Sequence, residues 1–82
     1  MINVVYLKSE KYGHKVIAYD YKNLKRIEVY NGYDCYTESF DDKDAIDFRF
    51  SLEKNFCIID KSEFDQALNK FEATLKDIKE QL

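Results

Sequence analysis

The chain has 82 residues, of which 45% are hydrophobic and 16% aromatic, and its net charge is −3. This length allows one domain with a modest core, and the aromatic content argues against disorder. No apolar run approaches the roughly 20 residues that span a bilayer, and the N-terminus lacks the apolar segment of a secretion signal. We therefore expect a single cytoplasmic domain over residues 1–82, with a sheet in 1–59 and a helix in 60–82.

Most of the chain before residue 60 has the pattern of short β-strands separated by polar turns. Strands are favoured by runs of Val, Ile and Tyr and by apolar residues that alternate with polar ones. Asn31-Gly32 is the strongest hairpin signal, because both central positions of a type I′ turn need positive φ. The predicted strands are 2–7, 15–21, 25–30, 33–37, 46–52 and 56–59.

The segment from Ile46 to Leu52 requires a choice between strand and helix. Apolar side chains at positions 46, 48, 50 and 52 alternate with polar ones at 47, 49 and 51. This two-residue period predicts a half-buried strand rather than a helix.

The C-terminal segment 60–82 has the periodicity of an amphipathic α-helix. Asp60 is the predicted N-cap, with Glu63 three residues later. The apolar residues follow spacings of four and three, which places them on one stripe: Phe64, Leu68, Phe71, Leu75, Ile78 and Leu82. The fold class predicted from these elements is α+β, a two-layer domain in which an antiparallel meander of about five strands is packed by one long C-terminal helix.

The lengths of these elements leave two interpretations of the helix end. A helix of about 21 residues is about 32 Å long, whereas a six-residue strand spans about 20 Å. Either the helix lies diagonally and covers the sheet fully, or its last turns project beyond it. In the second case Ile78 and Leu82 need another surface, such as a second copy of the chain in a homodimer.

Residue types that support catalysis are sparse. His14 lies in a predicted loop, serines lack the Gly-x-Ser-x-Gly context, and no glycine-rich loop is present to bind phosphate. Cys35 and Cys57 cannot complete a four-ligand zinc site with one histidine, and two buried thiols are favoured over a disulfide. We therefore predict no enzyme activity, no catalytic residues and no cofactor.

Acidic residues are concentrated in a predicted loop over residues 38–44. The segment fails the EF-hand template, because counting from Asp42 places Ile46 at the fifth position and Asp47 at the sixth, where an oxygen ligand and a glycine belong. We predict no metal site. Two readings remain for these acids: a solvated loop, or a negative surface that attracts a basic partner.

The aromatic residues divide the chain into two halves. All seven tyrosines precede residue 37, and all six phenylalanines follow it. Phe suits a dry interior, whereas Tyr has a polar tip that can stay in water. We therefore predict that the Phe half forms the core with the helix, and that the first strands carry a partly exposed Tyr face beside Lys15, Lys22, Lys25 and Arg26.

Two binding functions compete for that Tyr face. Tyrosine is enriched at protein–protein contacts, but Tyr with Lys and Arg on a sheet can also stack bases and neutralise phosphate. The leading hypothesis is a protein-binding module, an inhibitor or adaptor that acts by stoichiometric contact. Single-stranded nucleic-acid binding is the alternative, and the isoelectric point near 5.1 weakens it. The predicted partner-binding residues are Tyr19, Tyr21, Tyr30, Tyr33, Tyr36, Asp41, Asp42 and Asp44.

In its general character, the chain resembles the small accessory proteins of phages and mobile elements. It is short, acidic and rich in Lys, Asn, Ile and Tyr, and it lacks catalytic motifs. Some of those proteins, such as anti-CRISPR inhibitors, work by occupying a partner's surface. The resemblance is one of size and composition, covers no motif and transfers no residues.

Overall fold

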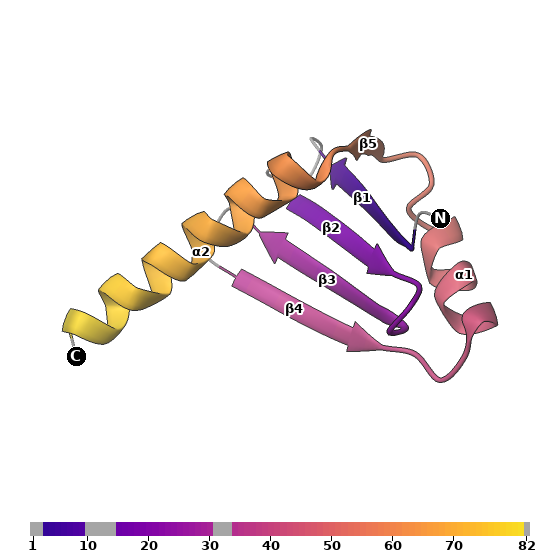
Figure 1. Cartoon of the computed structure of the whole chain (residues 1–82), viewed down its shortest axis with the longest axis horizontal. Coiled ribbons are helices and arrows are strands. Elements are labelled where there is room, and N and C mark those ends of the chain that lie inside the picture. The colour runs from indigo at the N-terminus through magenta and orange to yellow at the C-terminus, as the bar shows by residue number, and fades with distance from the viewer. Residues whose placement is uncertain (1–2, 10–14, 31–33, 82) are drawn as a thin grey trace.

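A computed structural model of the chain describes residues 3–9, 15–30 and 34–81 (Figure 1). Its elements are β1 (Val4–Ser9), β2 (Lys15–Asp20), β3 (Lys25–Tyr30), β4 (Asp34–Ser39), α1 (Lys43–Ser51), β5 (Cys57–Ile59) and α2 (Lys61–Gln81). The strands form one five-stranded sheet in the order β4-β3-β2-β1-β5, with every neighbouring pair antiparallel. The predicted α+β class, with an antiparallel meander and a long C-terminal helix, is confirmed.

The strand bounds agree with the sequence to within about two residues, and β1 lies inside the sheet as predicted. It pairs with β2 along its whole length and with β5 through residues 6–8. Strands β3 and β4 pair in antiparallel register from Tyr30 opposite Asp34 to Lys25 opposite Ser39. The Asn31-Gly32 turn between them lies outside the described residues. In the β2–β3 turn Leu24 has the left-handed conformation, with φ of 53°.

The prediction of a strand over residues 46–52 is wrong, because residues 43–51 form helix α1. The backbone N–H of Ala45 donates to the Asp42 carboxylate at 2.8 Å, so Asp42 caps the helix. Ile46 and Phe50, four residues apart, then lie on one side of α1 and pack into the core. The predicted acidic loop is correspondingly shorter, since Glu38 belongs to β4 and Asp44 to α1.

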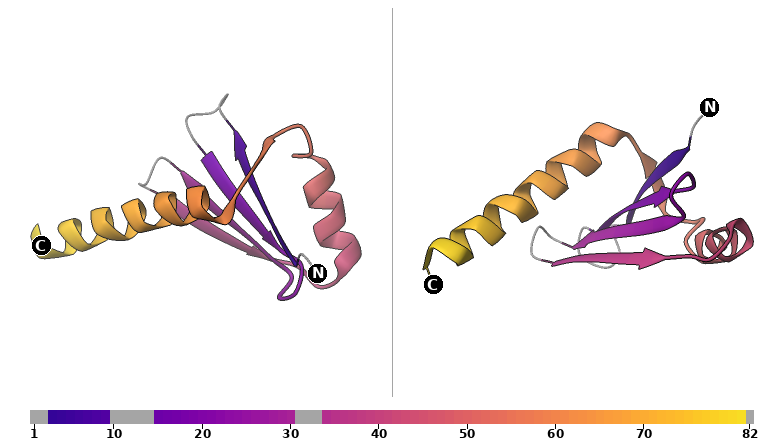
Figure 2. Two further views of the ribbon diagram at one scale, coloured as in Figure 1. Left: turned by 45° about the horizontal axis from the view of Figure 1, so that its top comes forward. Right: turned by 60° about the horizontal axis from the view of Figure 1, so that its bottom comes forward.

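Each face of the sheet has its own apolar cluster. The cluster on the α1 side contains Leu7, Ile17 and Tyr19 with Ile46 of α1. The cluster on the α2 side contains Val16, Ala18 and Val29 with Phe64 of α2. Figure 2 shows α2 crossing one side of the sheet while α1 lies at the far end of the strands. The central strands β2 and β3 are therefore covered from two directions.

The predicted division between a Phe-rich core and a wet Tyr face is wrong in part. Tyr19 has an exposed fraction of 0%, whereas Phe48 is 69% exposed. Most of the fully buried side chains come from β1, β2 and β3, the half of the chain that contains the tyrosines. A central strand is buried on both faces, so its position in the sheet determines burial more than the type of aromatic residue does.

Among the described residues, those of helix α2 that pack into an apolar cluster of the sheet lie in the first half of the helix. Asp60 accepts a hydrogen bond from the backbone N–H of Glu63 at 2.9 Å, which confirms the predicted cap. Phe64, Leu68 and Phe71 pack over the sheet, and beyond them the helix extends past the strands along the 43 Å long axis of the molecule (Figure 1). Within the described residues, no helix has the length and apolar content needed to cross a membrane.

Candidate protein-interaction surface

Helix α1 exposes two large apolar side chains to solvent. Residues two apart on a helix are separated by about 200°, so a two-residue alternation places apolar side chains on opposite sides of it. Ile46 is fully buried, whereas Phe48 and Leu52 are 69% and 63% exposed. Phe48 and Leu52 are four residues apart, so they are neighbours on the outer side of α1. Two adjacent exposed apolar side chains on one short helix suggest a contact surface.

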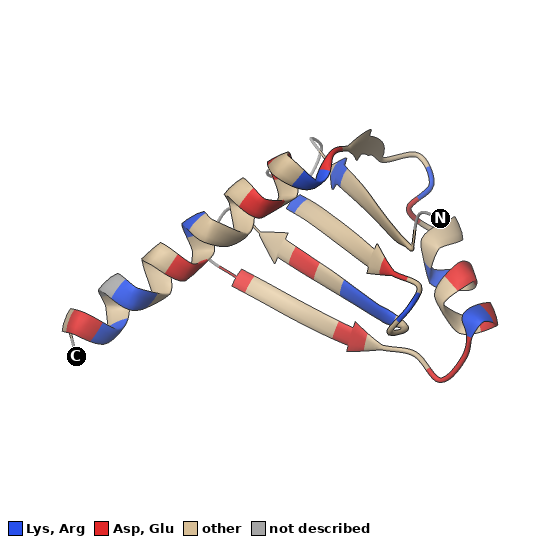
Figure 3. Ribbon diagram, viewed as in Figure 1, with Lys and Arg blue, Asp and Glu red and all other residues tan. Residues whose placement is uncertain are grey.

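Carboxylates lie on the N-terminal side of this apolar pair. Residues 41–47 contain four aspartates and Lys43, a net charge of −3 (Figure 3), and the four aspartates are exposed. Asp44 lies one helical turn before Phe48, and Asp47 is adjacent to Phe48 in sequence. We call Phe48, Leu52, Asp41, Asp44 and Asp47 the α1 surface. It combines two apolar side chains with a negative rim on their N-terminal side.

Glu53, which follows the C-cap Leu52, attaches α1 to the sheet. Its exposed fraction is 4%, and its carboxylate meets the equally buried guanidinium of Arg26 in β3. Arg26 donates from Nε to Oε1 and from Nη2 to Oε2 of Glu53, each at 2.8 Å. The Tyr19 hydroxyl also donates to Oε1 of Glu53. Because both charges are buried and paired in two-point geometry, this contact fixes the position of the C-terminal end of α1.

Three further charged residues surround this pair. Glu28 accepts from Nη2 of Arg26 at 2.8 Å and pairs with the Lys15 ammonium at 3.3 Å. Arg49 of α1 lies 3.5 Å from the Glu53 carboxylate. Together these groups form the buried network of Tyr19, Arg26, Glu53, Glu28, Lys15 and Arg49.

The network shifts the ionisation of its buried members. Burial raises the pKa of Tyr19, and the neighbouring Glu53 carboxylate raises it further. For Glu53, burial favours the neutral acid, but the hydrogen bonds from Arg26 and Tyr19 outweigh burial and hold its pKa below the ordinary value. The pKa of Arg26 is raised, because its carboxylate partners outweigh its own burial. The network therefore contains an ionised Arg26–Glu53 pair and a neutral Tyr19 at neutral pH.

The predicted tyrosine anchors are placed in different environments. Tyr19 is in the core, so the prediction that it contacts a partner is wrong for the folded chain. Tyr21 is half-buried against Phe50, with ring centroids 6.4 Å apart. Tyr30 is half-buried, Tyr36 is 58% exposed on β4, and Tyr33 lies outside the described residues. Of the described anchors, only Tyr36 presents most of its ring to solvent.

The three predicted aspartates lie together at the start of α1. Asp41, Asp42 and Asp44 are all exposed. Asp42 also caps α1 through its side chain, so it has a structural role whether or not it guides a partner.

The basic residues predicted to lie beside the Tyr face have two different roles. Arg26 is buried, and Lys15 is paired with Glu28, so neither can neutralise a phosphate without leaving a carboxylate partner. Lys22 and Lys25 are exposed. This pairing weakens the nucleic-acid alternative.

The two cysteines lie at opposite edges of the sheet, Cys35 in β4 and Cys57 in β5. Both thiols are free, and they cannot meet across three intervening strands. Burial raises the pKa of Cys35, whereas Cys57 is exposed, which corrects the expectation that both thiols are buried. The described part of the chain contains no group of three potential metal ligands, and His14 lies outside it.

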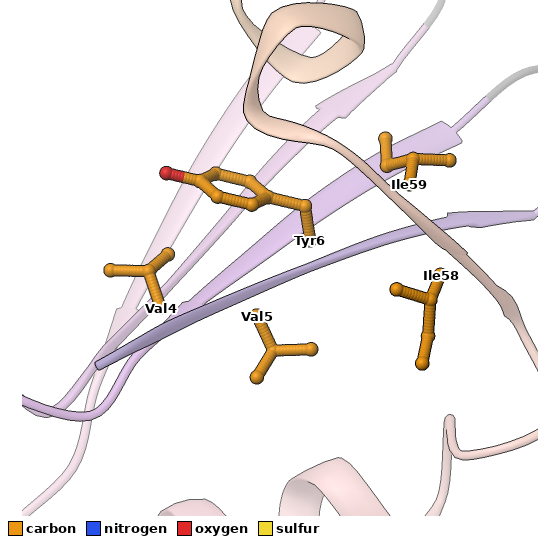
Figure 4. Close-up of a pocket in the computed structure, with 5 residues that line it drawn as sticks. All are labelled: Val4, Val5, Tyr6, Ile58 and Ile59. Atoms are coloured by element: carbon orange, nitrogen blue, oxygen red, sulfur yellow. The ribbon is translucent and has the colours of Figure 1, made fainter. Parts of the chain in front are cut away.

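A second apolar feature lies at the β1–β5 edge (Figure 4). It is an open hollow of about 350 Å³, lined by Val4, Val5, Tyr6, Ile58 and Ile59. It exists because β5 pairs with β1 only from Tyr6 onward, so no strand among the described residues lies against the edge beside Val4 and Val5. Apart from the Tyr6 hydroxyl, the side chains that line this hollow carry no polar group. The hollow therefore offers apolar contacts and no group for acid–base or nucleophilic catalysis.

Sequence reasoning missed the α1 surface and the buried network for different reasons. The strand prediction placed Phe48 on a core face, although the Asp42 cap was a readable signal for a helix start. The prediction places Arg26 beside a partly exposed Tyr face, whereas the structure buries it. The alternation in β3 nevertheless puts Arg26 and Glu28 on one face, which was visible from their spacing.

Comparisons with protein-family models, curated proteins and solved structures found nothing that matches this chain.

Proposed function

We propose that the protein is a small non-enzymatic binding module, an inhibitor or adaptor that acts in the cytoplasm by stoichiometric contact with another protein. The observation that carries this proposal is the α1 surface, where Phe48 and Leu52 are mostly exposed beside a rim of aspartates. Large apolar side chains placed next to each other in water serve no folding purpose, and an apolar centre with a polar rim is the common anatomy of a protein interface.

The charge of the rim indicates the chemistry of the partner. Four aspartates against one lysine in residues 41–47 favour a basic partner surface with an apolar recess that receives Phe48 and Leu52. Oppositely charged surfaces accelerate encounter and discriminate against acidic partners. The buried Glu53–Arg26 contact supports this function, because it holds the helix in place and reduces the entropy lost on binding.

The test is capture of partners by the tagged full chain from a lysate of the cells that produce it, with bound proteins identified by mass spectrometry. We expect the double variant Phe48→Ser, Leu52→Ser to lose the captured protein by more than roughly tenfold, which corresponds to about 1.4 kcal/mol. The control is Tyr36→Ser, which removes an exposed aromatic side chain on β4. Circular dichroism and thermal melting establish that each variant is folded.

Unchanged capture by the folded double variant rejects the α1 surface. If Tyr36→Ser alone loses the captured protein, the partner contact lies on the tyrosine-bearing strands instead. Bound material that disappears after nuclease treatment, and binding that weakens steeply with salt, select the nucleic-acid alternative.

A further inference from the structure

The last part of α2 carries apolar residues that the described part of the chain leaves partly exposed. Leu75 and Ile78 continue the stripe of Phe64, Leu68 and Phe71, but they are 40% and 50% exposed. Figure 1 shows the helix running past the strands at the end of the molecule opposite α1. Because the helix is held along its first half, this end is presented as a fixed, exposed stripe rather than as a free peptide.

We propose that this stripe is a homodimer contact, in which the α2 ends of two copies pair antiparallel about a two-fold axis between residues 76 and 77. In this arrangement Leu75 of one chain lies opposite Ile78 of the partner, and Ile78 lies opposite the partner's Leu75. Each of these two contacts joins apolar side chains only. A symmetric pair of this kind buries the same patch on both copies and closes at two chains.

The charges beside the stripe favour a second copy as the occupant and favour the antiparallel direction. Glu72 and Lys79 are seven residues apart, so they flank the stripe on the same side of the helix, and both are exposed. In the antiparallel pair, Glu72 of each chain faces Lys79 of the partner, which forms two ion pairs. A parallel pair instead sets Glu72 beside the partner's Ala67 and Lys79 beside the partner's Thr74, with no opposite charge.

The dimer leaves the α1 surface accessible, because α1 and the end of α2 lie at opposite ends of the 43 Å axis. Two copies joined through α2 would display two α1 surfaces facing away from each other. The contact between the copies is short, so we expect an association that depends on concentration rather than a permanent dimer.

The first test is sedimentation equilibrium of the full chain over a wide concentration range, in a reducing buffer because Cys57 is exposed. We expect a monomer–dimer equilibrium whose dissociation constant rises by roughly tenfold or more in the variant Leu75→Ser, Ile78→Ser. Ala73→Ser is the control, since position 73 lies on the opposite side of the helix. A chain that stays monomeric at every concentration overturns the proposal, and so does a dimer that Leu75→Ser, Ile78→Ser leaves unchanged.

The second test exchanges the flanking charges. Glu72→Lys alone and Lys79→Glu alone each set like charges against each other and should weaken the dimer, whereas the combined variant Glu72→Lys, Lys79→Glu should restore it. Glu80→Lys, on the far side of the helix, is the control with the same change of charge. If the combined variant is as weak as either single variant, the antiparallel arrangement is wrong. Neither test depends on the α1 surface. Failure of the dimer proposal can therefore be distinguished from failure of the proposed function.

Discussion

The two helices flank the same sheet, but their apolar residues are distributed in different ways. In α2 the apolar residues follow a three- and four-residue spacing and form one stripe, which is buried over the sheet and exposed only where the sheet ends. In α1 they follow a two-residue spacing, so Ile46 is buried while Phe48 is 69% exposed. The difference shows that an apolar pattern which does not match the period of its own element leaves some apolar side chains exposed.

The largest expected effect on the free energy of unfolding comes from a substitution on the buried side of α1, in contrast to one on its exposed side. Ile46→Ala removes a fully buried side chain and should lower the free energy of unfolding by about 3 kcal/mol. Phe48→Ala removes a mostly exposed one and should change it by less than about 0.5 kcal/mol. Urea denaturation measures both. If residues 46–52 formed a half-buried strand, positions 46 and 48 would share one face and the two costs would be similar, which would contradict the helical assignment.

A slightly smaller effect is expected where α1 is attached to the sheet. Glu53→Gln keeps the shape of the side chain but leaves the buried Arg26 without its two-point carboxylate partner, so the free energy of unfolding should fall by about 3 kcal/mol or less, since Glu28 remains. The measurement is denaturant unfolding at neutral pH, with Lys61→Gln as control, because Lys61 is an exposed charge in a surface pair.

The same carboxylate predicts part of the acid dependence. The folded pKa of Glu53 lies below its unfolded value of about 4.3, so its stabilising contribution is complete above that pH and is lost as the pH falls through the folded pKa. The stability difference between wild type and Glu53→Gln should therefore shrink below about pH 4. A difference that stays constant down to low pH would contradict the ionised pair.

The smallest expected effect on stability comes from removing the N-cap side chains, and we expect a similar cost for α1 and for α2. Asp42 accepts from the N–H of Ala45 at 2.8 Å, and Asp60 accepts from that of Glu63 at 2.9 Å. Asp42→Ala and Asp60→Ala should each cost about 1 kcal/mol in thermal or urea unfolding. Asn at either position is the control, since it caps nearly as well. A negligible cost at Asp42 would mean that Glu53 and Ile46 hold α1 without its cap.

Much of this fold could be predicted from local sequence patterns. The three- and four-residue spacing and the Asp60 cap identified α2 within one residue at each end. Alternating and β-branched residues located β1, β2 and β3 closely. These patterns are reliable because each reflects one element that buries one side of itself. At the candidate site, Asp41, Asp42 and Asp44 were identified as exposed acids, whereas Phe48 and Leu52 were assigned to the core.

By itself, then, the sequence determined the antiparallel meander, the long C-terminal helix and the acidic segment that precedes α1, because periodicity, turn chemistry and charge are local properties. The tertiary structure alone decided that Arg26 and Glu53 meet in the interior, and that Tyr19 is buried while Phe48 and Leu52 are not. The physical reason is that a buried ion pair between residues 27 positions apart and the two-sided burial of a central strand depend on which elements the fold brings together. No local pattern records that arrangement.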